Sequence, residues 1–298
     1  MISRARQGKG GDLETRYAAV FGDPIAHSLS PAMHNAAFRA LGLPYAYLKF
    51  RVPLVELGAA LKGIAAMGFE GVNLTIPLKE EGARLMDSLS PQAKKIGAVN
   101  TVVVRNGRLE GHNTDALGFL RSVSEEWKFR VRGARVAMLG TGGAARAICF
   151  ALAGAGARHI SLLGILPGQM KRLKRDLCDR SAVNVSADLL GRGFRFDRAL
   201  EGVDLLVNAT PVGMKGEASP VPASAMRSPL KVVDLVYNPA VTGLIAAARG
   251  RGLGAINGVG MLVHQGALAF ELWTRRAAPV PVMRRALLAG LRGAKRPG

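Results

Sequence analysis

The stretch around residue 75 carries the side chains whose types and spacing are best suited to catalysis. Asn73, Thr75 and Lys79 lie in the run Asn-Leu-Thr-Ile-Pro-Leu-Lys, where an apolar strand ends and a helix begins. Because ligands of parallel sheets gather at the carboxyl ends of strands, these side chains are well placed to reach one. A positioned ammonium group stabilises developing negative charge and donates a proton. Taken alone, Lys79 is more typical of a solvated surface lysine, so its assignment depends on its neighbours.

Two serines upstream form a second candidate site. The run Ser28-Leu29-Ser30-Pro31 predicts a helix that begins with Ser30 as N-cap and Pro31 in the first turn. Hydroxyl groups beside the free N–H groups of a helix start make a receptor for a carboxylate. Capping alone explains Ser30 equally well, whereas Ser28 is not needed as the cap and favours ligand binding.

An amide and a carboxylate complete the polar set. Asn100 lies in Gly-Ala-Val-Asn-Thr at the start of a predicted strand, and Asp115 ends the run Gly-His-Asn-Thr-Asp before a predicted helix. Asp115 by itself fits a simple role at the positive end of a helix dipole. Their coincidence with the serines and the lysine predicts one shared polar binding site.

A glycine-rich loop predicts a dinucleotide site. Gly140, Gly142 and Ala145 follow the compact strand 135–139 and open a helix. The first glycine permits a tight turn, the second lets the backbone approach a pyrophosphate, and the small Ala145 lets the helix pack closely on the strand. An ordinary glycine turn is the alternative, but strand, loop and helix all agree with a nicotinamide cofactor.

The next strand suggests which nicotinamide cofactor binds. It ends at Gly164-Ile165-Leu166, without the acidic residue that accepts the hydroxyls of an unphosphorylated ribose. Lys171 and Arg172 follow closely. This pattern favours NADP(H), although a solvated basic helix face explains the two cations as well, and NAD stays open.

Strand-like runs alternate with amphipathic stretches along the chain, which predicts an α/β fold with parallel sheets. We expect two domains with a ligand cleft between them. The first is an α/β substrate domain over residues 15–114 and 257–298, to which the C-terminal helices return. The second is a doubly wound Rossmann-type domain over residues 115–256, and residues 1–14 form a disordered basic tail. The predicted strands are 17–21, 45–52, 70–75, 99–105, 108–112, 135–139, 159–163, 203–207 and 231–236, and the predicted helices begin at 30 and 143 and cover 55–67, 114–126, 261–273 and 282–291.

Composition limits the classes of partner. The chain has 298 residues, 49% of them hydrophobic, and a formal net charge of +20. Because its cations are scattered and aromatic residues make up only 5%, we expect no dedicated nucleic-acid surface. The longest apolar stretch, 147–157, is too short to cross a membrane, and the His and Cys residues show no metal-ligand spacing. Two cysteines make no disulfide framework, which predicts a cytoplasmic protein.

At this point the motifs match a known family. From about Tyr17 to Trp273 the chain resembles shikimate dehydrogenase, an enzyme of aromatic amino-acid biosynthesis. The resemblance rests on Ser28-Leu29-Ser30, the run 73–79, Gly97-Ala98-Val99-Asn100-Thr101, Asn113-Thr114-Asp115, Gly140 to Arg146, the run 208–214, the run 234–239 and the run 258–265.

The resemblance implies roles for individual residues. Ser28 and Ser30 would bind the substrate carboxylate, and Lys79 and Asp115 would form the catalytic pair. The ring hydroxyls would be held by Thr75, Asn100, Asp115 and Gln265, with Tyr237 lining the cleft. Cofactor binding is assigned to Gly140, Thr141, Gly142, Gly143, Ala144, Ala145, Thr210, Val236, Gly258 and Met261.

The implied reaction is the reversible NADP(H)-dependent reduction of 3-dehydroshikimate to shikimate by a monomer or homodimer. One departure matters, because the family usually has Asn-Arg-Thr where this chain has Gly164-Ile165-Leu166. An NAD-dependent quinate/shikimate dehydrogenase is therefore the first alternative, and a non-catalytic nucleotide- or nucleic-acid-binding protein is the second. The sequence also leaves open whether Lys79 transfers the proton or mainly stabilises charge.

Overall fold

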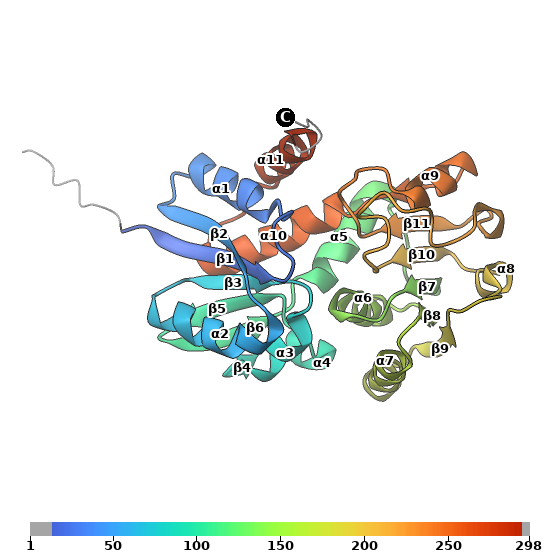
Figure 1. Ribbon diagram of the computed structural model, residues 1–298, viewed down its shortest axis with the longest axis horizontal. Helices are drawn as coiled ribbons and strands as arrows, with labels where there is room; N and C mark the ends of the chain where they lie inside the picture. The colour runs from blue at the N-terminus through green and yellow to red at the C-terminus, as the bar shows by residue number, and fades with distance from the viewer. Residues whose placement is uncertain (1–13, 294–298) are drawn as a thin grey trace, which may run out of the picture.

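The computed structural model describes residues 14–293, which form two lobes, each built on a six-stranded sheet (Figure 1). The strands of the first sheet lie between residues 16 and 112, and those of the second between 135 and 256. The predicted tail over residues 1–14 lies outside the described residues except for its last residue. The two-lobed α/β architecture confirms the predicted fold class.

The first sheet is mixed, with strand order β2-β1-β3-β5-β6-β4. β1 pairs in parallel with β2 and β3, while β5 and β6 form an antiparallel hairpin. The hairpin turn at Asn106 and Gly107 has φ values of 52° and 74°, the left-handed conformation of a type I′ turn. The strands are β1 (Arg16–Gly22), β2 (Tyr45–Arg51), β3 (Gly71–Leu74), β4 (Ser88–Leu89), β5 (Thr101–Arg105) and β6 (Arg108–His112).

Helices cover both faces of the first sheet. α1, α10 and α11 share one apolar core that includes Phe38, Phe270 and Met283, and α2 covers the opposite face through Leu57 and Leu61. Because α10 and α11 pack here, the predicted return of the C-terminal helices is confirmed. The helices are α1 (Ser30–Ala40), η1 (Leu54–Glu56), α2 (Leu57–Ala66), α3 (Lys79–Arg84), α4 (Pro91–Ile96), α10 (Val259–Thr274) and α11 (Val280–Gly293).

The second sheet is entirely parallel, in the order β12-β11-β10-β7-β8-β9. The chain reverses its direction of winding between β7 and β10, the switch point at which doubly wound sheets bind ligands. α6 and α7 cover one face of this sheet and α9 the other. The elements are β7 (Arg135–Leu139), α6 (Gly143–Gly154), β8 (His159–Gly164), α7 (Pro167–Arg180), β9 (Asn184–Leu189), α8 (Phe196–Ala199), β10 (Leu205–Asn208), η2 (Ala223–Ala225), β11 (Lys231–Asp234), α9 (Gly243–Gly250) and β12 (Ala255–Ile256).

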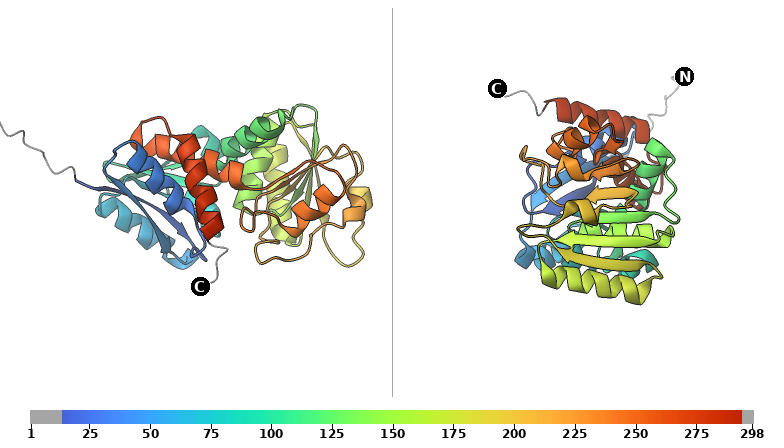
Figure 2. Two further views of the ribbon diagram at one scale, coloured as in Figure 1. Left: turned by 90° about the horizontal axis from the view of Figure 1, so that it is seen from above. Right: turned by 90° about the vertical axis from the view of Figure 1, so that its right-hand side faces the viewer.

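Two helices connect the lobes. α5 (Asp115–Trp127) leads from the first sheet to the second, and α10 leads back beside it (Figure 2). α5 also packs on α6 of the second lobe, where Phe119 and Ile148 belong to one buried cluster. The lobes are therefore joined by packed helices and not by a flexible linker.

The structure corrects two local predictions. Ser30 is the first residue of α1 and not its N-cap, which is Leu29, and no side chain caps this helix. The predicted helix 55–67 is split, because its first residues belong to the 3-10 turn η1. Among the described residues, no helix is both long and apolar enough to cross a membrane.

Candidate active site

A buried ion pair lies at the junction of the two lobes. Lys79 begins α3 and Asp115 begins α5, and the lysine Nζ donates to the aspartate Oδ2 at 2.6 Å. Their side chains are only 12% and 5% exposed. These residues are 36 positions apart in the sequence, and the fold brings an ammonium and a carboxylate into direct contact.

Asn100 organises the carboxylate. Its Nδ2 donates to Asp115 Oδ1 and to Thr114 Oγ1 at 2.9 Å each, and to Gln265 Oε1 at 3.3 Å. Its Oδ1 accepts the Thr114 backbone N–H at 2.7 Å. Because an amide nitrogen carries only two protons, a ligand oxygen that reaches Asn100 must displace one of these acceptors. Gln265, with the longest contact, is the acceptor most easily displaced.

Gln265 comes from α10 and faces the first lobe. Its Nε2 donates to the Leu262 carbonyl at 2.9 Å, which fixes the amide so that Oε1 points to Asn100. The close approach of α5 and α10 depends on Gly118, since a Cβ there would lie 2.8 Å from the Gln265 Cβ. A side chain at Gly118 would push Gln265 away from the site.

Two further buried side chains, Tyr47 and Asn73, hold Asn100 in place through hydrogen bonds. The Tyr47 hydroxyl donates to Asn73 Oδ1 at 2.6 Å, and Asn73 Nδ2 donates to the Asn100 carbonyl and to Thr101 Oγ1 at 3.0 Å each. His34 stacks on Tyr47 with ring centroids 4.3 Å apart, and neither ring nitrogen has a hydrogen-bond partner among the described residues. Burial lowers the pKa of His34 to about 3.

The two serines lie at a corner that both lobes share. Ser28 Oγ accepts the Ser30 N–H at 3.4 Å, so Ser28 has a local structural role that the sequence analysis did not give it. Tyr237 follows β11 in the second lobe and accepts the N–H of Leu29, and burial raises the pKa of its hydroxyl. Ser28, Leu29 and Lys49 line a cavity of about 520 Å³.

Thr75 lies where β3 ends, four residues before Lys79. It directly follows β3, is half-buried, and packs its methyl group over Gly22 at the end of β1, where a Cβ would collide with it. The end of β1 and the residues that follow β3 are therefore in direct contact beside Thr75.

The glycine-rich loop after β7 has the shape that a pyrophosphate needs. Gly140 has φ of +94°, and its Cβ position lies 3.0 Å from Thr210, so the turn has no room for a side chain. Gly142, unlike Gly140, faces open space, because no described atom lies within 4 Å of its Cβ position. This open space precedes the N-terminus of α6, whose first N–H groups, on Gly143, Ala144 and Ala145, point toward it. The cradle therefore fits the pyrophosphate of a dinucleotide.

Gly143 joins the cofactor loop to the ion pair. A Cβ at this position would lie 3.0 Å from the Lys79 Cβ and 3.3 Å from its Cδ. The aliphatic stem of Lys79 thus rests on the first turn of α6. Gly143 is required here by contact with the lysine as well as by the loop.

Two further predicted cofactor residues, Thr210 and Val236, follow the neighbouring strands β10 and β11. Thr210 follows β10 and its hydroxyl donates to Asn208 Oδ1 at 2.6 Å, while Asn208 Nδ2 donates to Asp234 Oδ1 at 2.9 Å. The same carboxylate oxygen accepts the Val236 N–H at 3.1 Å, and burial raises the pKa of Asp234. Asn208 and Asp234 therefore fix the loops that carry Thr210 and Val236.

Other members of the predicted cofactor set have mainly structural contacts. Gly258 caps α10 and approaches the Leu235 carbonyl too closely for any side chain. Met261 is 8% exposed within the core that the lobes share, and Ala145, in the first turn of α6, is fully buried. The Thr141 hydroxyl donates to Gln169 Oε1 at 3.3 Å, which ties the loop to α7.

The carboxyl end of β8 is unusual for its apolar surface. Ile165 and Leu166 are 71% and 49% exposed directly before α7. Lys171 and Arg172 are both exposed, and an Arg172 guanidinium nitrogen lies 3.6 Å from the Cβ position of Gly168 in the first turn of α7. Arg172 therefore folds back toward the first turn of α7, which begins shortly after β8 ends.

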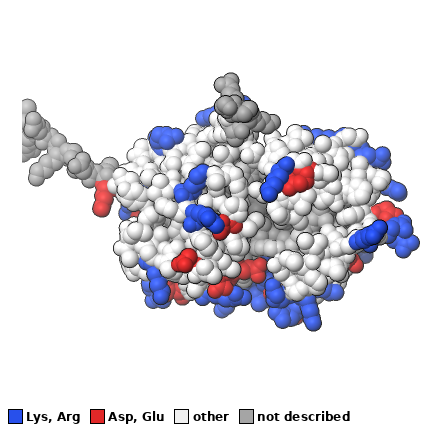
Figure 3. Space-filling model, viewed as in Figure 1, with Lys and Arg blue, Asp and Glu red and all other residues white. Residues whose placement is uncertain are grey.

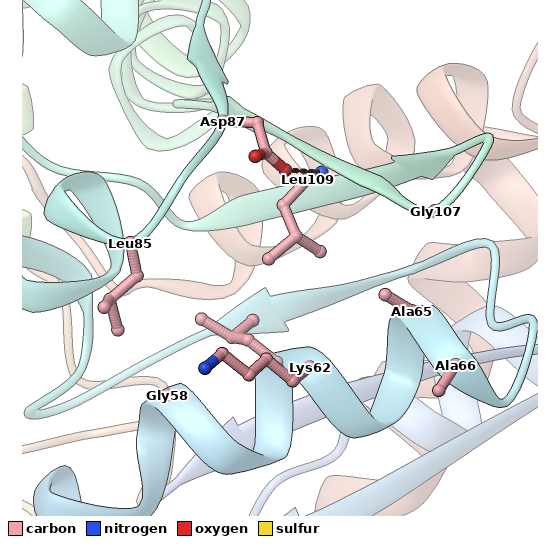
Figure 4. A pocket seen from close by; sticks show the side chains of 9 residues that line it. Gly58, Lys62, Ala65, Ala66, Leu85, Asp87, Gly107 and Leu109 are labelled. Atoms are coloured by element: carbon pink, nitrogen blue, oxygen red, sulfur yellow. Dashed lines mark hydrogen bonds between the residues drawn. The ribbon is translucent and has the colours of Figure 1, made fainter.

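A second large cavity lies away from these groups. It has a volume of about 500 Å³ and lies between α2 and the β5–β6 hairpin (Figure 4). Lys62 and Asp87 are its charged lining residues, and Asp87 Oδ2 already accepts the Leu109 N–H at 2.7 Å. This cavity brings together none of the side chains that the sequence assigned to chemistry.

Figure 3 shows Lys and Arg on both lobes of the face that it draws, with Asp and Glu among them, and several Lys or Arg side chains gather along its lower edge. The described residues hold no group of three or more His, Cys, Asp or Glu side chains that could bind a metal ion.

Sequence reasoning did not assign Tyr47, Thr101, Thr114, Asn208 or Asp234 to the site. The last four lie inside the motifs on which the family resemblance rests, and this position was the signal that could have identified them. Tyr47 gave no such signal, because its role depends on β2 lying beside β1.

Comparisons with known proteins agree with this geometry. The sequence model of the shikimate dehydrogenase substrate binding domain matches residues 20–102, and that of the shikimate 5'-dehydrogenase C-terminal domain matches residues 258–288. Shikimate dehydrogenase (NADP(+)) of Methanopyrus kandleri is 49% identical over 285 residues, covering 94% of this chain and 98% of the relative.

Solved structures show the same fold. Shikimate 5-dehydrogenase from Thermus thermophilus in complex with NADP(H) and shikimate has a TM-score of 0.82 and 39% identity, covering 93% of this chain and all of its own. Shikimate 5-dehydrogenase from Listeria monocytogenes in complex with shikimate and NAD has a TM-score of 0.83 and 35% identity, covering 95% and 98%.

Proposed function

This chain belongs to the shikimate dehydrogenase family, and from that premise we propose that it catalyses the reversible NADP(H)-dependent reduction of 3-dehydroshikimate to shikimate. The observation that carries the proposal is the buried Lys79–Asp115 pair against Gly143, the first residue of α6 after the open cradle. The site therefore has an ammonium group within reach of a nicotinamide that enters through the glycine-rich loop.

The binding roles follow from position. The substrate carboxylate binds at the Ser28–Ser30 corner, where hydroxyl groups lie close to Lys49 and Tyr237. The ring hydroxyls contact Thr75, Asn100, Asp115 and Gln265, of which Asn100 is hydrogen-bonded to both Asp115 and Gln265. Because Asn100 has no spare donor, substrate binding shifts Gln265 Oε1 away from it.

The bound nicotinamide supplies or accepts the hydride. Reduction puts negative charge on the ketone oxygen, and the Lys79 ammonium stabilises that charge and gives the oxygen a proton. Asp115, held by Asn100, keeps the lysine Nζ aimed at the oxygen. In the reverse direction the neutral Lys79 amine takes the proton from the hydroxyl group and becomes the ammonium. Burial of both side chains keeps bulk water from screening the pair.

The cofactor proposal rests on the cradle and on Arg172. Gly142 and the N–H groups of α6 would hold the pyrophosphate, and the loops that carry Thr210 and Val236, together with Met261 on α10, would border the nicotinamide half. Arg172, with Lys171 beside it, takes the place of the family's usual arginine at the 2'-phosphate. The exposed Ile165 and Leu166 offer the adenine an apolar surface.

The division into domains follows the same function. We assign residues 15–114 and 257–298 to substrate binding and residues 115–256 to the cofactor, with α5 and α10 between them. Small molecules are the partners that this site needs, and we expect the chain to act as a monomer or homodimer.

Steady-state kinetics tests the proposal. Shikimate oxidation is followed through the absorbance of the reduced nicotinamide with NADP⁺ and with NAD⁺, and quinate is assayed in parallel. We expect turnover of shikimate with a higher kcat/KM for NADP⁺. Turnover only with NAD⁺ and quinate would replace this function by the quinate-type alternative, and no turnover of either substrate would exclude both.

A further inference from the structure

Arg146 is a buried cation that no step of the proposed reaction uses. It lies in the first turn of α6, directly after the glycine-rich loop, and is 7% exposed. Its Nε donates to the carbonyl of Ile96, the last residue of α4 in the first lobe, and its Nη2 donates to Asp176 Oδ2 on α7 at 2.5 Å. One guanidinium therefore ties helices of both lobes together.

The first-lobe end of this tie leads directly into the active site. Ile96 begins the short segment 96–101 that carries Asn100. Within it, the Ala98 carbonyl accepts from Asn113 Nδ2 at 2.9 Å, and the Val99 N–H donates to the Lys79 carbonyl at 2.8 Å. Arg146 thus anchors the beginning of the segment that holds both members of the catalytic pair.

The second-lobe end leads to the cofactor loop. Arg146 follows Gly143 closely in the same helical turn, and Gly143 is the residue that contacts the Lys79 stem. The position of Arg146 along α6 therefore also fixes the loop that receives the pyrophosphate.

The fit around the guanidinium is close. Arg146 Nη2 lies 3.0 Å from the Cβ position of Gly97, which has φ of +71° as the left-handed cap of α4. Any side chain at Gly97 would collide with the guanidinium. This contact explains why the motif Gly97-Ala98-Val99-Asn100-Thr101 begins with a glycine. The neighbouring contact between the lobes, from Arg180 to the Lys95 carbonyl at 3.1 Å, is exposed.

A buried guanidinium restricts the distance between the groups that it joins. It must keep both acceptors within hydrogen-bond reach, because a buried charge that loses its partners is strongly destabilised. Asp176 supplies the charge that permits its burial, and the Ile96 carbonyl supplies the reach into the first lobe.

We propose that Arg146 is a positioning residue that sets the separation of the two lobes at the active site, and with it the distance over which hydride moves between nicotinamide and substrate. The proposal rests on the function proposed above for its kinetic part, but its structural part is measured independently of turnover.

Two variants test it. Arg146→Met removes the tie, and Arg146→Met with Asp176→Leu removes both charges, so that Asp176 is not left buried with only the exposed Arg175 as its partner. We expect kcat for shikimate to fall about 10- to 100-fold in both, with the KM for shikimate changing less than about threefold, because geometry and not binding is lost. With shikimate deuterated at the carbon that loses hydride, the isotope effect on kcat rises, since hydride transfer becomes slower than product release.

The separation of the lobes is measured directly. Cys178 on α7 is exposed and Cys149 is buried, so spin labels attach at Cys178 and at an introduced Lys62→Cys on α2. We expect a single narrow distance distribution for the parent protein with NADP⁺ and a broader or shifted one for both variants. Arg195→Met, which breaks an exposed pair with Asp197 inside the second lobe, is the matched control and leaves all readouts unchanged.

The outcomes separate the two proposals. A protein that does not turn over shikimate refutes the proposed function, while the distance distributions still decide whether Arg146 sets the spacing. An unchanged distribution in a folded double variant overturns the inference, and so does a fall in kcat without any change in distance or isotope effect.

Discussion

Replacing Lys79 by methionine isolates the ammonium group from the rest of the side chain. The stem of Lys79 packs on Gly143, and methionine keeps a Cβ, a Cγ and nearly the same length. The variant therefore retains the contact between the lobes and removes only the charge that faces the ketone oxygen.

Two magnitudes follow from the structure. Loss of a positioned acid and charge costs about 10²- to 10⁴-fold in kcat, or about 2.7 to 5.4 kcal/mol in the barrier. Asp115 is 5% exposed and loses its counter-charge, which costs about 3 to 5 kcal/mol of folding free energy for a buried pair. Since Asn100 still donates to the carboxylate and Lys79 is itself 12% exposed, we expect the lower end of that range.

The assay combines kinetics with urea unfolding. Lys79→Met should lower kcat by at least about a hundredfold with little change in the KM for shikimate, and Lys79→Met with Asp115→Asn should recover stability but not activity. Lys62→Met, on the exposed face of α2, serves as the control. If Lys79→Met kept its kcat, the assignment of proton transfer and charge stabilisation to this lysine would be refuted.

Three further predictions concern other groups. Ser28→Ala and Ser30→Ala should each raise the KM for shikimate about 10-fold or more with kcat nearly constant, since a hydrogen bond to a carboxylate is worth about 1.5 to 3 kcal/mol in ground and transition state alike; an unchanged KM in both would remove the carboxylate from this corner. Arg172→Met should raise the KM for NADP⁺ about tenfold and leave that for NAD⁺ unchanged, and equal effects on both would place the 2'-phosphate elsewhere. Burial lowers the pKa of His34 to about 3, so protons bind preferentially to the unfolded chain and stability falls as pH drops below about 6.5, by about 1.4 kcal/mol per pH unit. His34→Leu should lose this slope in urea unfolding between about pH 7 and 5, and an identical slope in both proteins would show that His34 is not the group responsible.

Local signals predicted much of the fold. Asn106-Gly107 is correctly predicted as the turn between β5 and β6, because a type I′ turn needs positive φ at both residues and these two adopt it readily. The strand 135–139, the glycine-rich loop and α6 also agree with the prediction, since each residue's role there depends on its immediate neighbours. β9 and β12, the two edge strands of the second sheet, were not predicted, because β9 has no buried residue and β12 has only two residues, so neither shows an apolar run.

The candidate site, like the fold, has parts that the sequence predicted and parts that it did not. Lys79 and Asp115 were predicted as a pair only through resemblance, since they lie 36 positions apart and nothing local joins them. The role of Ser28 toward the Ser30 N–H was missed, because the capping preference pointed to Ser30 itself. Arg146 was visible in the sequence as the end of a motif, but its two acceptors lie on α4 and α7.

The sequence by itself determined which chemical groups this chain offers: hydroxyl groups beside a helix start, a lysine ammonium after a strand, and a glycine turn before a helix. These depend on residue type and on spacing within one strand–loop–helix unit. Only the tertiary structure decided which groups meet, because Lys79, Asp115, Gln265 and Gly143 belong to α3, α5, α10 and α6. Their distances are set by how the helices of two lobes pack, which short-range spacing does not encode.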